Sequence, residues 1–314
     1  MPAWAAGYQP QMEMPPLTER LQVALGAHPD SFDTRTTLLT LLDVHALHLA
    51  PLDQLDGAET WQHDPRVAAL KRSLETRFRS RIDGGSADGW TDAGEALPRL
   101  ARQEPVPPIY DWLAEHATRD ELVEFVSLEG GPDADFDDLV AICQVGLTGA
   151  PKVTLGANYW DEMGRGTLRR VHTQLHDRMV RALGIRAVPA TELPLEALER
   201  KVLNGYLATN RALQPELLGN LGLIECQAGP RCRQVVAAMR RLGVPPDALP
   251  FYEEHASVDP GHGREWIDGA VVPLTRAHPE WNQRIARGAA WRATVNDRFF
   301  AAMDRRFRGA ARAA

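Results

Sequence analysis

Apolar residues recur at every third or fourth position along most of the chain, and alternating runs of β-branched residues are missing. This spacing predicts amphipathic helices with one buried face each. Residues 36–49 and residues 66–82 show the pattern in the first part of the chain. Two longer apolar stripes follow later in the chain, Leu195/Leu198/Val202/Tyr206 and Trp291/Val295/Phe299/Met303/Phe307. The pattern predicts an all-α protein.

Glycine and proline interrupt the helical pattern and mark the connections between helices. The run Pro105-Val106-Pro107-Pro108 is the clearest of these interruptions. We therefore expect two parts, a helical N-terminal extension at residues 1–104 and a larger helical bundle at residues 105–314.

The composition narrows the class of protein. The chain has 314 residues, with 35 Lys and Arg against 42 Asp and Glu, so its net charge is −7. A mildly acidic chain is a poor binder of nucleic acid. No apolar run approaches the roughly 20 residues of a membrane span, and the first residues do not resemble a signal peptide. The cysteines at positions 143, 226 and 232 form no CxxC pair. We expect a reduced, cytoplasmic protein that binds neither nucleic acid nor membrane.

The last predicted helix is rich in arginine. Eight arginines lie between positions 284 and 312, against Asp297 and Asp304. A patch for an anionic partner is one interpretation. The favoured one is a solvated face opposite the apolar stripe, with cations that complement the helix dipole.

The segment from His255 to His262 carries the sharpest chemical signal. His255, Asp259 and His262 are spaced i, i+4, i+7, which places them on one stripe of a helix. Two imidazoles and a carboxylate without thiolate suit iron or manganese better than a structural zinc. A polar surface face is the plain alternative. Pro260 predicts that this helix is kinked or locally unwound.

Two glutamates lie on apolar helix faces. Glu225 follows Leu218 and Leu221 at i−7 and i−4, and Glu129 follows Leu122 and Phe125 in the same way. A buried carboxylate is costly unless a cation relieves it, so both are candidate metal ligands. An exposed helix end before Gly130 is the alternative for Glu129.

A third segment, residues 158–172, places Glu162 ten residues before His172. The glycines at 164 and 166 predict a bend, which would let both side chains point inward. His172 shares an apolar stripe with Leu168 and Leu175, and His176, one turn later, is the alternative ligand. We expect Asp161 to face away or to cap the helix.

These elements in this order resemble the haem-oxygenase-like diiron oxidases and oxygenases, a family of iron-containing redox enzymes. The segments FDDLVAICQVGLTGAPKVTLGANYWDEMGRG and EEHASVDPGHGREW carry the resemblance, which extends over residues 119–272. It implies a haem-oxygenase-like helical bundle and a set of iron ligands. The matching positions are Glu162, His172, Glu225, His255, Asp259 and His262, with Glu129 as a seventh candidate and Asp133 as its alternative.

The resemblance also implies the chemistry. Two irons without haem and O₂ as co-substrate would oxidise a small metabolite, and we expect N-oxygenation of an amine or an amino-acid-derived substrate. Oxidative C–C cleavage of a fatty or amino acid, of the decarboxylase or desaturase type, is the alternative on the same site. A non-catalytic helical binding protein is the alternative of another class. The resemblance is also compatible with an external electron donor and with a homodimer.

Overall fold

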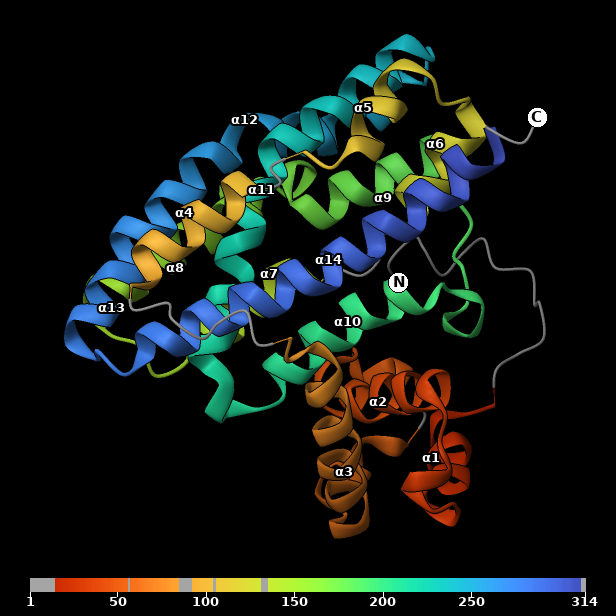
Figure 1. Cartoon of the computed structure of the whole chain (residues 1–314), viewed down its shortest axis with the longest axis vertical. Helices are drawn as coiled ribbons and strands as arrows, with labels where there is room; N and C mark the ends of the chain where they lie inside the picture. The colour runs from red at the N-terminus through yellow and green to blue at the C-terminus, as the bar shows by residue number, and fades with distance from the viewer. Residues whose placement is uncertain (1–14, 56, 85–91, 104–105, 131–134, 312–314) are drawn as a thin grey trace.

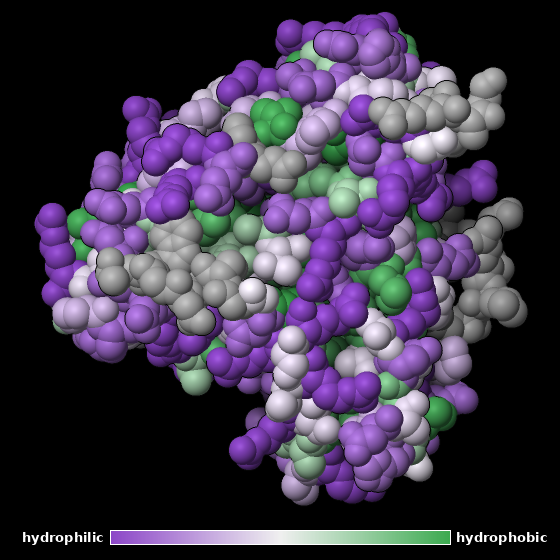
Figure 2. Space-filling view, viewed as in Figure 1, coloured by the Kyte–Doolittle hydropathy of each residue, from purple (hydrophilic) through white to green (hydrophobic). Residues whose placement is uncertain are grey.

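The structure, a computed structural model, describes residues 15–55, 57–84, 92–103, 106–130 and 135–311. These residues form helices and connecting turns, without a strand among them, so the all-α prediction is confirmed. Within the same residues no helix combines the length and the apolar character of a membrane span. Figure 2 shows a mostly hydrophilic face on which hydrophobic residues form small, separate patches.

The helices match the predicted segments closely. Residues 36–49 and 66–82 correspond to α2 and α3, whose first turns are capped by the side chains of Asp33 and Asp64. An aspartate at this position accepts a hydrogen bond from a backbone N–H that would otherwise lack a partner. The helices in chain order are α1 (Leu17–Gly26), α2 (Thr34–Leu49), α3 (Pro65–Ile82), α4 (Ala93–Gln103), α5 (Pro108–Glu115), α6 (Arg119–Glu129), α7 (Phe136–Cys143), α8 (Gly149–Glu162), α9 (His172–Leu183), α10 (Leu195–Ala208), α11 (Gln214–Arg241), α12 (Pro250–Glu265), α13 (Val272–Ala277) and α14 (Trp281–Ala311).

The first three helices form a group at one end of the molecule, beside α10 (Figure 1). Of the remaining helices, α12, α14, α5 and α4 pack most extensively on α11. Helix α4 belongs by sequence to the expected extension and packs on α11 and α14. The expected boundary at residues 104–105 lies outside the described residues and stays a prediction.

Small residues allow α11 and α12 to approach closely. A β-carbon at Gly229 of α11 would lie 2.9 Å from the ring of Pro260 on α12. A β-carbon at Gly263 of α12 would likewise lie 3.1 Å from the backbone of Cys226 on α11. The expected local unwinding at Pro260 is not observed, because α12 continues through it to Glu265. The irregular turn comes later, as a π-helical segment at Trp266–Val271.

The expected solvated arginine face of α14 is only partly observed. Most of these arginines pair with carboxylates on other helices, as Arg284 and Arg287 do with the buried Glu216. Arg292 departs furthest from the expectation, because its side chain is buried inside the bundle with 2% exposure. The reason is its position, one residue after Trp291 and on the inner side of a helix that crosses the core.

Candidate metal centre

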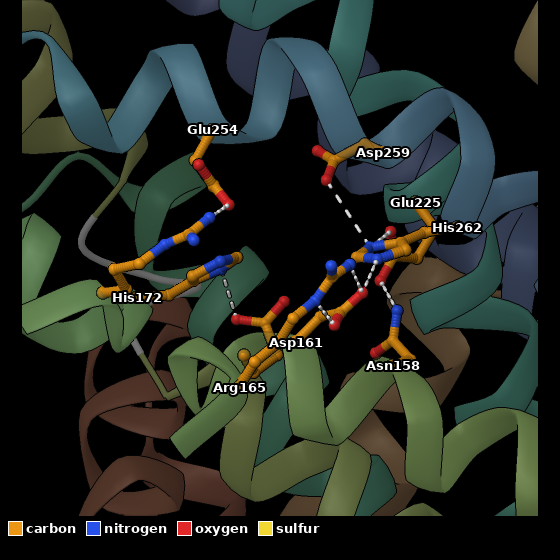
Figure 3. A network of polar contacts seen from close by, with 10 residues as sticks. Asn158, Asp161, Arg165, His172, Glu225, Glu254, Asp259 and His262 are labelled. Atoms are coloured by element: carbon orange, nitrogen blue, oxygen red, sulfur yellow. Dashed lines mark hydrogen bonds and ion pairs between the residues drawn. The ribbon is translucent and has the colours of Figure 1, made fainter. Parts of the chain in front are cut away.

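Six of the predicted ligands come together in two groups of three inside the bundle. Within each group, one oxygen or nitrogen atom per residue lies within 4.8 Å of those of the other two. We call Glu162, His172 and His255 the first cluster. The second cluster consists of Glu225, Asp259 and His262. Helices α8, α9, α11 and α12 supply these side chains, and Figure 3 labels His172, Glu225, Asp259 and His262 among them.

In the first cluster the two imidazoles and the carboxylate converge. The Nδ1 atom of His172 lies 2.7 Å from Oε2 of Glu162, and the rings of His172 and His255 have centroids 4.6 Å apart. The Nδ1–H of His255 donates to the carbonyl oxygen of Phe251 at 2.6 Å. That bond fixes the ring orientation and leaves Nε2 of His255 as the nitrogen with a lone pair.

The second cluster is oriented by side chains of α8. The Nδ1 atom of His262 lies 3.6 Å from Oε2 of Glu225 and 3.8 Å from Oδ1 of Asp259. On the other side of the ring, Nε2–H of His262 donates to Oδ2 of Asp161 at 3.0 Å. Asn158 donates to Oε1 of Glu225 at 2.7 Å. Outer partners of this kind hold metal ligands in position and fix the histidine tautomer.

The turn after α8 links the two clusters. Glu162 ends α8, and three successive residues, Gly164, Arg165 and Gly166, have left-handed backbones with φ of 59°, 52° and 77°. A side chain at Gly164 would collide with the backbone at residues 170–171. The turn is followed by a short 3₁₀ turn at Leu168–Arg170 and then by α9, which begins at His172. It also places the guanidinium of Arg165 on Asp161, at 2.5 and 3.0 Å.

Burial and neighbouring charges shift the pKa values of these groups in opposite directions. Burial, together with the charges of Glu225 and Glu162, raises the pKa of Asp259 well above its usual value. Burial lowers the pKa of His262, but Glu225 and Asp161 outweigh that effect and raise it to about 9. The pKa of His172 is also raised, since Glu162 outweighs burial. The pKa of His255 is lowered by burial and by the nearby His172.

The residues fit a pair of divalent cations. The Nδ1 atoms of His172 and His262 are buried and, among the described residues, make no hydrogen bond, although carboxylate oxygens lie close by. Buried nitrogen and oxygen atoms that face one another without a well-directed hydrogen bond are costly, and a metal ion would relieve that cost. Three carboxylates and three imidazoles are also the donors that iron and manganese prefer.

The alternatives left open by the sequence are distinguished by position. His176 is outside both clusters and packs its ring against Phe251, with centroids 5.2 Å apart. Asp161 contacts His262 instead of facing away, because it lies on the side of α8 toward α12. Glu129 is near the clusters but in neither, and it accepts hydrogen bonds from Tyr110 and Tyr252. Its role as a seventh ligand stays a prediction, and Asp133 lies outside the described residues.

A cavity of about 130 Å³ adjoins both clusters and is lined by five of the six ligands. Sequence reasoning did not single out several of its other polar residues. Asp137 lines it, and burial together with Asp138 raises the pKa of Asp137 to about 6. Asn158 was also missed as a partner of Glu225, although its place four residues before Glu162, on one helix face, was a signal.

The comparisons with known proteins agree with this geometry. No curated protein matches the chain. A family model described as iron-containing redox enzyme matches residues 123–297, which is more than half of the chain and includes all six cluster residues. The match fits the haem-oxygenase-like bundle that the resemblance implied. This chain belongs to the family of iron-containing redox enzymes.

Proposed function

We propose that the protein is an O₂-dependent non-haem diiron oxidoreductase that oxidises a small metabolite, most directly by N-oxygenation of an amine or an amino-acid-derived substrate. The observation that carries the proposal is the pair of clusters. The six donors fall into two separate groups of three, which favours two ions over one, and both groups adjoin one cavity. Membership of an iron-containing redox family supports iron as the metal.

Each cluster would hold one iron. Glu162, His172 and His255 would bind the first, and the second cluster would bind the other. Bound iron would supply the activation of O₂ and the transfer of electrons. N-oxygenation places one oxygen atom of O₂ on the substrate nitrogen and releases the other as water. The reaction consumes two protons and two electrons, and an external donor would supply the electrons.

The chain's own residues prepare this chemistry. Asp161 and Asn158 hold His262 and Glu225 in the orientation in which Nδ1 of His262 faces Oε2 of Glu225. Apolar side chains on the same cavity wall, Ile224 and Phe251 among them, limit the access of water. Removal of water strengthens every electrostatic interaction between a bound substrate and these groups.

Anaerobic titration with Fe(II) tests the proposal. We expect two equivalents per chain and, on mixing with O₂, oxidation products from a panel of amines and amino acids. Mass spectrometry separates the outcomes, because N-oxygenation adds one oxygen atom whereas oxidative cleavage releases a smaller product. A maximum of one equivalent at saturating Fe(II) would contradict the diiron site. Absence of iron uptake would favour the non-catalytic binding protein.

A further inference from the structure

The segment from the end of α8 through α9 is strongly basic. Residues 161–186 contain six arginines against three carboxylates, whereas the chain as a whole has a net charge of −7. One of the three carboxylates, that of Glu162, is buried in the first cluster. Most of the arginines are exposed, namely Arg165, Arg169, Arg170, Arg181 and Arg186. This side of an otherwise acidic protein therefore presents a positive potential to solvent.

Ion pairs on this side leave the surplus of positive charge in place. Arg165 pairs with Asp161, and Nη2 of Arg170 lies 3.1 Å from Oε1 of Glu254 on α12. The arginines still outnumber the carboxylates when Glu254 is included. Exposed ion pairs of this kind are weak in water, so a guanidinium can exchange its partner for a carboxylate of another protein.

Two large apolar side chains lie beside these arginines. Trp160 is 53% exposed and Leu168 is 75% exposed. The ring of Trp160 rests on the turn that carries Arg165, because a β-carbon at Gly166 would lie 2.8 Å from that ring. Tryptophan and arginine are among the side chains that contribute most to protein–protein interfaces. We call Trp160, Arg165, Leu168, Arg169 and Arg170 the basic surface.

A single carboxylate connects the basic surface with the second cluster. Asp161 accepts hydrogen bonds from Arg165 and from Nε2–H of His262, and Figure 3 shows both contacts. On the other side of the imidazole, Nδ1 of His262 lies 3.6 Å from Oε2 of Glu225. A partner seated on the basic surface is therefore one side chain away from a residue of the candidate metal centre.

We infer that the basic surface is the docking site for an acidic electron-carrier protein. Carboxylates of the carrier pair with the arginines, while Trp160 and Leu168 supply the apolar contact. The inference rests on the proposed function, because N-oxygenation consumes two electrons from an external donor. The carrier loses one electron in each encounter, so two encounters supply both. Together with two protons from solvent, these electrons reduce the oxygen atom that leaves as water.

An electron carrier fits this place better than other anionic partners do. Nucleic acids and anionic membranes also attract arginine, but neither exchanges electrons, so the contact between Asp161 and His262 would serve no purpose for them. The carboxylates of Asp161 and Glu254 among the arginines also oppose a uniform polyanion. Electron-transfer complexes bury small interfaces and bind weakly, which matches a surface of five side chains steered by charge.

Binding to the metal-free protein tests the docking site independently of iron. The probes are two acidic carriers, a plant-type iron–sulfur ferredoxin and a flavodoxin, and two other polyanions, duplex DNA and phosphatidylserine vesicles. We expect at least one carrier to bind in calorimetric titration, with an affinity that falls as the ionic strength rises. Binding of neither carrier, or tighter binding of DNA or vesicles at the same ionic strength, would overturn the inference.

A charge reversal assigns the binding to the basic surface. Arg169→Glu should weaken binding of the carrier by about tenfold at low ionic strength, and salt should reduce the difference. Arg66→Glu is the matched control, because Arg66 is an exposed arginine on α3 and lies outside the basic surface. It should leave the affinity unchanged. Equal weakening in both variants would reveal an effect of net charge alone and would refute the docking site.

Stopped-flow reduction of the oxidised, iron-loaded protein separates docking from the metal site. Leu168→Ser changes no charge and alters an exposed side chain, so the fold should remain intact. Reduction by the carrier should slow by about threefold to tenfold, whereas reduction by dithionite should keep its rate. Equal slowing with both reductants, or none with the carrier, would contradict the inference. Failure of iron uptake would contradict the proposed function, and binding to the metal-free protein would still decide the docking site.

Discussion

The bundle contains two kinds of buried histidine–carboxylate cluster, and they differ in how their charges are balanced. Near the N-terminal helices, Glu75 contacts Nε2 of His45 at 3.0 Å and Nζ of Lys71 at 2.8 Å, and it accepts from Asn210 at 2.9 Å. A fixed cation thus neutralises the carboxylate within the protein. The ring of His45 also packs against Gly205, where even a β-carbon would collide with it. We call His45, Lys71, Glu75 and Asn210 the closed cluster, because its charges are balanced within the protein.

The metal clusters use the same residue types without such a cation. In the first and second clusters, as far as the described residues show, the carboxylates of Glu162, Glu225 and Asp259 face histidines instead of a lysine. Buried carboxylates without a fixed cation create a demand for a mobile one. The difference teaches that the presence of a lysine, more than the presence of histidine and glutamate, separates a structural cluster from a metal site.

The largest expected effect comes from removing one carboxylate from each kind of cluster. Asp259→Ala should reduce Fe(II) uptake from two equivalents to one and reduce O₂-dependent turnover to background. The metal-free variant should be as stable as the parent protein or more stable, because the folded state no longer holds a carboxyl group whose pKa is raised by burial. Metal analysis and thermal unfolding in a chelator measure the two effects.

Glu75→Ala is the counterpart in the closed cluster. It leaves Lys71 poorly solvated and unpaired from its carboxylate, so the free energy of unfolding should fall by about 3 kcal/mol. Iron uptake should remain at two equivalents wherever the variant is folded. Loss of iron in Glu75→Ala, or loss of stability in metal-free Asp259→Ala, would break the comparison.

A medium effect is expected from glycines that set the geometry. Gly229→Ala places a β-carbon 2.9 Å from the ring of Pro260, so α12 must move away from α11 and carry Asp259 away from Glu225. We expect the affinity of the second cluster for Fe(II) to fall by about tenfold, since positions of metal ligands tolerate little displacement.

Gly261→Ala is the matched control on the same helix. A β-carbon there meets nothing within 4 Å, so iron affinity should not change. The free energy of unfolding should rise by up to about 1 kcal/mol, because alanine loses less backbone entropy than glycine on folding. Equal effects of the two substitutions on iron affinity would show that the close packing of α11 and α12 does not set the ligand geometry.

The sequence was sufficient to predict the all-α fold and the six residues that the structure brings together. Helical periodicity is local, and the spacing from His255 to His262 is independent of tertiary structure. The sequence did not reveal the contact between Asp161 and His262, because it joins residues 101 positions apart on two helices. The sequence also did not reveal that Arg292 points inward. An arginine beside an apolar stripe can be either buried with the stripe or exposed to solvent.

The smallest expected effect is that His45 of the closed cluster and His262 of the second cluster respond to pH in opposite directions in the metal-free protein. Burial lowers the pKa of His45 despite Glu75, whereas the pKa of His262 is raised to about 9. A histidine whose folded pKa is lowered contributes stability above about pH 6.5, the unfolded value, and loses it as the pH falls. A histidine whose folded pKa is raised contributes stability below that value and loses it as the pH rises toward 9.

Acidification from pH 7 to 5 should therefore lower the free energy of unfolding through His45, and alkalinisation from pH 7 to 9 should lower it through His262, each by on the order of 1 kcal/mol. Urea unfolding with a chelator at the three pH values measures both. His45→Gln should remove the acid-side loss alone, and His262→Gln the alkaline-side loss alone. An identical pH profile in both variants would mean that the two clusters are not electrostatically distinct, and the lysine of the closed cluster would then not be the feature that separates them.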